Sequence, residues 1–111
     1  MELGFQTGKL GKECNDFALL RKAHGEQRAK LIRRRLDAIR AAGVLEDLRN
    51  VPGRLHELTG NRKGQLSLDL DGPYRLIFIP DHNPVPKKAD GGMDWSQITA
   101  VLIIGIEDTH E

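Results

Sequence analysis

The sequence predicts an α+β fold, in which a helical hairpin is followed by an antiparallel meander of strands. Two periodicities support this prediction. Apolar residues recur every three or four positions up to about residue 42, which is the spacing of a helix face, and every second position from residue 66, which is the spacing of a strand. The chain has 111 residues, 39% of them hydrophobic, which suits one domain spanning 1–111 with a single modest core.

The first half of the chain predicts a short edge strand and then two helices. Residues 1–7 are a mixed segment that fits an edge strand. The first helix has one apolar face, formed by Leu10, Cys14, Phe17 and Leu20. Gly25 is a natural end for it, and a second helix is predicted from about 26 to 42. The apolar stripe of that second helix consists of Ala29, Ile32, Leu36 and Ile39.

The second half predicts the sheet. Residues 44–53 are interpreted as a linker with one helical turn at 45–48. Leucines then alternate with polar residues over 66–70, which indicates a half-buried strand. The Asp71-Gly72 pair is typical of a hairpin turn, and 74–79 is the next strand.

A long loop and a buried strand complete the prediction. Residues 81–94 are rich in Pro, Gly and Lys, and loops of this length are more often functional or mobile than structural. Residues 98–106 are almost wholly apolar, so we expect them to be the central strand, covered on both faces. A polar tail, 107–111, continues from it.

Composition excludes several classes of protein. One cysteine, Cys14, leaves no internal disulfide, which excludes a disulfide-stapled secreted fold. No stretch approaches the length of apolar residues that spans a membrane, and the N-terminus lacks the pattern of a secretion signal. We therefore expect a cytoplasmic protein.

The net charge of +1 hides a basic segment. Residues 21–40 contain eight Lys or Arg residues and only two acidic residues. This surface either meets phosphates or an acidic partner, or is a solvated helix face.

Histidines are the first candidates for chemistry, because the ordinary histidine pKa of about 6.5 suits proton transfer near neutral pH. His24 is interpreted as a structural or surface residue at a helix end, and His82 as a solvated loop residue. His56 and His110 lie among polar residues at the predicted sheet edge, and they are the candidates for acid and base.

A metal site is a weaker alternative. His56, Asp108 and His110 would form a set of two histidines and one carboxylate, but no closely spaced ligand pair accompanies them. The chain also lacks a Gly-rich phosphate loop and a recognisable nucleophile turn. Cys14 fits a small core residue. We expect no metal and no cofactor.

Basic residues around position 62 form a candidate phosphate-binding group. Arg62 and Lys63 lie in a turn between glycines, and Arg54 and Arg75 flank it in sequence. The alternative is a solvated hairpin with ion-paired arginines. Arg75 lies within an apolar strand, so it either faces solvent or points into a functional concavity.

Taken in order, five short segments resemble the HigB-type killer toxins of the RelE/ParE superfamily. They are Arg54-Leu55-His56-Glu57-Leu58, Gly60-Asn61-Arg62-Lys63-Gly64, Leu66-Ser67-Leu68-Asp69-Leu70, Tyr74-Arg75-Leu76-Ile77-Phe78 and Ile106-Glu107-Asp108-Thr109-His110. The resemblance runs over nearly the whole chain and includes the insert at 81–95.

The resemblance implies a RelE-like α+β fold, with two N-terminal helices packed on a small curved antiparallel β-sheet. It implies a metal-independent endoribonuclease that cleaves mRNA, usually in the ribosomal A site. It also implies a helix-turn-helix antitoxin as partner, and operator DNA bound through the complex with that antitoxin. The implied catalytic residues are His56, Arg75, Asp108 and His110, and the implied RNA contacts are Arg54, Arg62 and Lys63.

Two positions depart from the family pattern. Many relatives have lysine where this chain has Thr59, and many have tyrosine where it has Thr109. Threonine neither stacks well on a base nor moves a proton well, so these departures weaken a strict copy of the family mechanism. Two alternatives therefore stand beside the ribonuclease: an inhibitor of DNA gyrase like the ParE toxins, and a weakened toxin that acts as co-repressor with its antitoxin.

Overall fold

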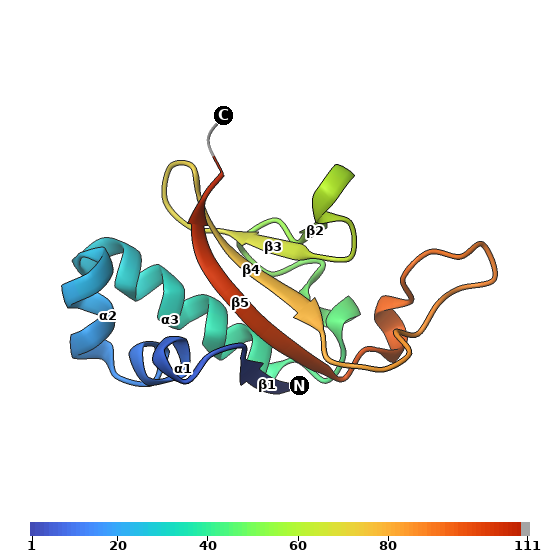
Figure 1. The fold of residues 1–111 in the computed structure, drawn as a ribbon, viewed down its shortest axis with the longest axis horizontal. Coiled ribbons are helices and arrows are strands. Elements are labelled where there is room, and N and C mark those ends of the chain that lie inside the picture. The colour runs from blue at the N-terminus through green and yellow to red at the C-terminus, as the bar shows by residue number, and fades with distance from the viewer. Residues whose placement is uncertain (110–111) are drawn as a thin grey trace.

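The structure, a computed structural model, describes residues 1–109 and confirms the α+β prediction (Figure 1). Three α-helices and three short 3-10 helices accompany a five-stranded sheet in this part of the chain. The strands are β1 (Glu2–Phe5), β2 (His56–Glu57), β3 (Leu66–Asp69), β4 (Tyr74–Pro80) and β5 (Ala100–Asp108). The helices are α1 (Gly8–Cys14), α2 (Phe17–His24), α3 (Glu26–Ala41), η1 (Leu45–Leu48), η2 (Gly60–Arg62) and η3 (Trp95–Gln97).

The first predicted helix is in fact two helices. Thr7 caps α1, and Asp16 caps α2 by accepting hydrogen bonds from the backbone N–H groups of Ala18 and Leu19. An aspartate in this role has an extended backbone, which interrupts the helix although the apolar spacing continues through it. Gly25 lies between α2 and α3, as predicted.

The sheet is mixed, whereas an antiparallel sheet was expected. Its strand order is β1-β5-β4-β3-β2, and β1 pairs in parallel with β5 while the other pairs are antiparallel. The chain between β1 and its partner β5 contains all three α-helices and the other three strands, and parallel pairing requires a long connection of this kind.

The expectation that 98–106 forms the central strand is wrong, because β4 is central and β5 lies beside it. Both strands are largely apolar and both are flanked by other strands, so an apolar run does not show which of the two is central. An irregularity in the pairing between Ile77 and Phe78 places Ile103 opposite Phe78 and leaves Ile104 as an extra residue. This bulge turns both Ile103 and Ile106 toward the core.

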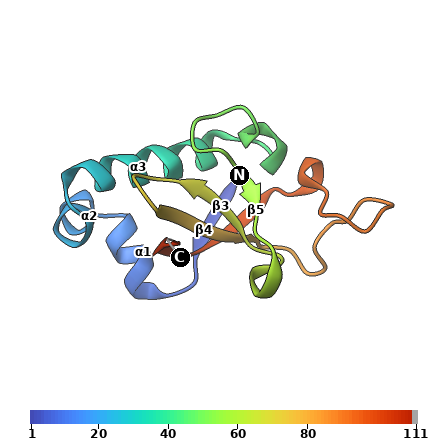
Figure 2. The same ribbon diagram turned by 90° about the horizontal axis from the view of Figure 1, so that it is seen from above.

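The core lies between α3 and one face of the sheet, and Figure 2 shows α3 running along that face. All four residues of the predicted stripe of α3 are buried there. Leu45 and Leu48 of η1 are fully buried as well, so the predicted linker contributes to the core through its helical turn. Among residues 1–109, no helix is long and apolar enough to cross a membrane.

Residues 81–94 project from one end of the molecule (Figure 1). Backbone hydrogen bonds close the base of this loop, from Asp94 N to Pro86 O at 2.9 Å and from Lys88 N to Gly92 O at 2.7 Å. His82 is half-buried at the start of the loop, and its Nε2 accepts a hydrogen bond from Thr99 N at 3.0 Å. The loop is therefore a small closed hairpin.

Candidate functional site

The sheet face opposite α3, here called the distal face, is arranged in three rows. Side chains of directly paired residues point to the same side of a sheet, so the strand register identifies each row. The first row is charged and consists of Asp69, Arg75 and Glu107. The second consists of His56, Ser67, Ile77 and Gly105. The third is apolar and consists of Ile79, Leu102 and Gly4.

His56 lies on the edge strand β2, as expected, and both of its ring nitrogens have partners. Its Nδ1 is 3.0 Å from the carbonyl oxygen of Arg54, and its Nε2 is 3.3 Å from the hydroxyl oxygen of Ser67. A carbonyl oxygen only accepts, so Nδ1 carries the proton of the neutral ring and Nε2 has the lone pair. The Ser67 hydroxyl donates to that lone pair. His56 is thus an exposed side chain with a basic nitrogen on the distal face.

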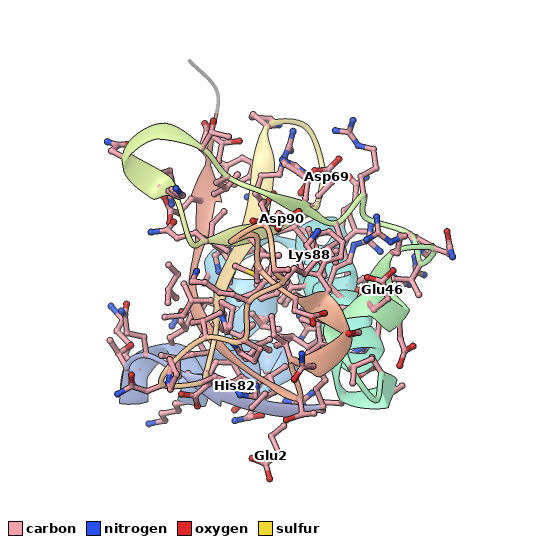
Figure 3. The ribbon with its side chains drawn as sticks, turned by 90° about the vertical axis from the view of Figure 1, so that its right-hand side faces the viewer. Glu2, Glu46, Asp69, His82, Lys88 and Asp90 are labelled. Carbon is pink, nitrogen blue, oxygen red and sulfur yellow. The ribbon has the colours of Figure 1, made fainter. Side chains whose placement is uncertain are left out.

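Arg75 lies on the distal face beside Asp69. Its Nε is 2.8 Å from Oδ1 of Asp69, and its Nη1 donates to the carbonyl oxygens of Gly72 and Tyr74 at 3.0 and 2.9 Å. Arg54 donates from Nε to Oδ2 of the same aspartate at 2.5 Å. Figure 3 shows Asp69 near one end of the sheet, with His82 near the other. Two of the predicted arginines therefore share one carboxylate.

Arg62 reaches from η2 across to β5. Its guanidinium forms a two-pronged ion pair with Glu107, at 3.0 and 2.8 Å, and its Nε donates to Gln65 at 3.1 Å. The hydrogen bonds to Glu107 raise the pKa of Arg62 above its ordinary value. Lys63, the next residue, is exposed. The structure thus places Arg62 beside the charged row that contains Arg75.

Asp108 lies on the other side of the sheet from His56. It pairs with Tyr74, whose ring packs against the core and lies 3.4 Å from the guanidinium carbon of Arg28. The negative charge of Asp108 is one cause of the raised pKa of Arg28, after the larger effect of Asp71. His110, the other predicted catalytic histidine, lies outside the described residues.

The two departures from the family pattern have clear local settings. Thr109 bonds to Pro73 twice, since both its backbone N–H and its hydroxyl donate to that carbonyl at 3.0 Å. Thr59 is exposed and precedes η2, where its side chain makes no capping hydrogen bond. The Thr109 hydroxyl therefore anchors the end of β5 to the turn between β3 and β4.

Three residues of the site were not singled out from the sequence. They are Ser67, Asp69 and Glu107, the partners of His56, Arg75 and Arg62. Ser67 gave the opposite signal, because its alternation with leucines predicts a half-buried strand with Ser67 on the polar side, whereas Ser67 is fully buried. Among the described residues, no group of three or more His, Cys, Asp or Glu side chains is arranged to hold a metal ion.

Comparison with known proteins decides the family. A search of curated proteins finds no match. The model of the HigB-like toxin family, described as the RelE-like toxin of the type II toxin–antitoxin system HigB, matches residues 14–87, roughly two thirds of the chain. The chain belongs to the HigB-like toxin family. It is a RelE-like toxin, and membership of a type II system implies an antitoxin partner.

The match covers most of the distal face of this HigB-like toxin. His56, Arg62 and Arg75 lie within it, and so do Ser67 and Asp69. It ends inside the projecting loop, before β5. The C-terminal acid and histidine thus lie beyond the part of the chain on which family membership rests.

Proposed function

We propose that this HigB-like toxin is a metal-independent endoribonuclease that cleaves mRNA on the ribosome. The observation that carries the proposal is the placement of a basic histidine nitrogen, on His56, on the same sheet face as Arg75 and Arg62. Cleavage of RNA by its own 2′-hydroxyl needs a base, an acid and cations for the extra negative charge. The distal face supplies the base and the cations.

In this mechanism His56 is the base. When the Ser67 hydroxyl turns away, the Nε2 lone pair takes the proton from the 2′-hydroxyl, whose oxygen attacks the adjacent phosphorus, and the bond to the leaving 5′-oxygen breaks. Arg75 stabilises the negative charge on the phosphate, and Arg54, Arg62 and Lys63 bind neighbouring phosphates.

His110 is the proposed acid that protonates the leaving 5′-oxygen, and Asp108 is the proposed residue that orients it. Asp108 lies on the α3 side of β5, near Arg28. We therefore propose that Asp108 acts on the reaction by orienting His110 and not by contacting His56. The helix-turn-helix nature of the antitoxin, operator binding by the complex and a cytoplasmic location belong to the same proposal.

Expression in bacteria without the antitoxin tests the proposal. We expect growth to stop, translation to fall and mRNA to be cleaved, and we expect His56→Gln to relieve all three effects. His24→Gln is the matched control, because His24 pairs with Glu13 at 2.8 Å away from the distal face. Intact mRNA with an active DNA-damage response would instead favour a gyrase inhibitor. Absence of toxicity with retained antitoxin binding would favour a co-repressor.

A further inference from the structure

Three arginines converge on one residue of the distal face, Asp69. Arg54 donates a hydrogen bond to Oδ2 of its carboxylate at 2.5 Å, and Nε of Arg75 lies 2.8 Å from Oδ1 in an ion pair without hydrogen-bond geometry. Arg35 of α3 donates from Nε to its backbone carbonyl oxygen at 2.9 Å. The Asp69 side chain thus contacts two cations, both of which belong to the proposed RNA-binding surface, and its backbone binds a third.

The backbone around Asp69 fixes this arrangement. Its N–H donates to the carbonyl oxygen of Gly53 at 2.7 Å, which ties the loop that carries Arg54 to the end of β3. Gly53 has a φ of +116°, and a side chain there would meet Arg35 Nε at 2.8 Å. Arg54 itself has a φ of +49°, a left-handed conformation that is uncommon for residues with side chains. The loop therefore presents Arg54 to Asp69 at the cost of local strain.

The exposed fractions of the three side chains in these ion pairs show which side chain is held most firmly in place. The side chain of Asp69 is 16% exposed, that of Arg75 is 20% exposed and that of Arg54 is 77% exposed. A nearly buried carboxylate is held by its surroundings, whereas an exposed arginine has many rotamers available in water. Asp69 thus restricts the position of Arg54 more than Arg54 restricts the position of Asp69.

The charges do not cancel within this group. Two guanidinium groups contact the Asp69 carboxylate and a third, that of Arg35, binds its backbone carbonyl oxygen, so a positive excess remains in the group after the ion pairs have formed. Burial is the largest cause that lowers the pKa of Arg35, and Asp69 opposes it. A negatively charged ligand would therefore be attracted to the group, with Asp69 limiting the strength of that attraction.

We propose that Asp69 is a positioning residue that sets Arg54 and Arg75 at a fixed spacing for two phosphates of the RNA strand. This inference rests on the proposed function. Asp69 contacts the arginines and not the RNA. The negative charge of Asp69 repels the phosphates and so weakens RNA binding. Its carboxylate also holds the two guanidinium groups in a defined arrangement, which favours the reaction.

Asp69→Asn separates the effect of Asp69 on RNA affinity from its effect on the cleavage rate. The variant keeps the shape of the side chain and loses its charge. We expect the single-turnover rate of cleavage of ribosome-bound mRNA to fall by about ten-fold or more, since misplaced groups lose rate steeply. We also expect affinity for a 2′-O-methyl oligoribonucleotide, which lacks the attacking hydroxyl, to hold or increase. The slope of log affinity against log salt should steepen by up to about one.

Asp71→Asn is the matched control. Asp71 is also an aspartate in an ion pair with an arginine, Arg28, but it lies beyond the end of β3 and contacts none of the three arginines around Asp69 in the described structure. It should keep the wild-type rate and the wild-type salt slope. A thermal melt of each variant shows whether it folds. If Asp69→Asn does not fold, Asp69→Glu replaces it, with a salt slope like that of the wild type and a lower rate expected from its longer side chain.

Two results would overturn the inference: an unchanged rate in a folded Asp69→Asn, or an equal loss of rate in Asp71→Asn. Weaker oligonucleotide binding by Asp69→Asn would also overturn the inference, because it would show that Asp69 strengthens RNA binding instead of limiting it. The oligonucleotide assay needs no cleavage. If the wild type cuts no RNA, the proposed function fails, while the salt slopes still report whether Asp69 governs how the arginines meet phosphates.

Discussion

At His56 the two ring nitrogens have different partners, and this difference determines which of them has the lone pair. The Arg54 carbonyl holds the proton on Nδ1, so Nε2 is the basic atom. The hydroxyl that meets Nε2 belongs to Ser67, which is fully buried. A buried hydroxyl without a partner would be unfavourable, so the contact also stabilises the strand pair that carries the histidine.

Sequence reasoning at the residue scale predicted individual candidate side chains but not their partners. Residue type made His56, Arg62 and Arg75 candidates, and the resemblance to the HigB-type toxins implied their roles. Their placement on one sheet face depends on strand register, and the ion pair between Arg62 and Glu107 joins residues 45 positions apart. Local patterns do not encode contacts at that separation, so Glu107 could not be predicted as the partner of Arg62.

The ion pair between Asp71 and Arg28 gives a pH-dependent prediction. Two hydrogen bonds from Arg28, at 2.8 and 3.1 Å, lower the pKa of Asp71 in the folded protein. A lowered folded pKa means that the stabilisation is complete above the unfolded value of about 3.9 and is lost as the pH falls through the folded value. We expect Asp71→Asn to lower the free energy of unfolding by about 1–2 kcal/mol at pH 7. Urea denaturation at several pH values should show this difference shrinking below a pH of about 4, and a constant difference would contradict the assignment.

At the scale of elements, the helical region shows how a cap overrides a continuous apolar pattern. Cys14 and Leu20 both lie in the core, as a single helix face would place them. The chain nevertheless changes direction between them, because Asp16 satisfies the first N–H groups of α2. The apolar spacing predicts burial correctly and the continuity of the helix incorrectly. The same spacing rule gave both results.

Removing the cap tests this account of the helix break. We expect Asp16→Ala to destabilise the protein by about 1 kcal/mol, the usual loss for an N-cap aspartate. In a chain of this size that corresponds to a fall in Tm of about 4 °C. Asp37→Ala is the control, since Asp37 forms an exposed ion pair with Arg40 at 3.7 Å within α3. Equal melting temperatures for the two variants, measured by circular dichroism, would show that the cap contributes little.

At the scale of the whole molecule, the order of elements was predictable and the order of strands was not. The turn at Asp71-Gly72, the 3-10 turn at 45–48 and the edge position of the first strand all follow from local chemistry, and the structure confirms them. The parallel pairing of β1 and the central position of β4 depend on how distant segments pack. The bulge at Ile104 could not be predicted either, because the apolar run around it has no break that would mark an extra residue.

The distal face is a property of the whole molecule as well. Four strands and η2 contribute to its charged and histidine-containing rows, so no single segment contains the site. Helix α3 covers the opposite side of the sheet, so the charged and histidine-containing rows lie on the face that it does not cover. The central claim is that these residues cleave RNA through a base on His56.

The most direct test is the single-turnover cleavage of mRNA on purified ribosomes by the wild type and by His56→Gln. Glutamine keeps a polar side chain of similar reach but does not take up a proton near neutral pH. The account predicts products with a 2′,3′-cyclic phosphate and a 5′-hydroxyl, and a rate about 10²–10⁴-fold lower for the variant. A folded His56→Gln that cleaves mRNA at the wild-type rate would contradict it.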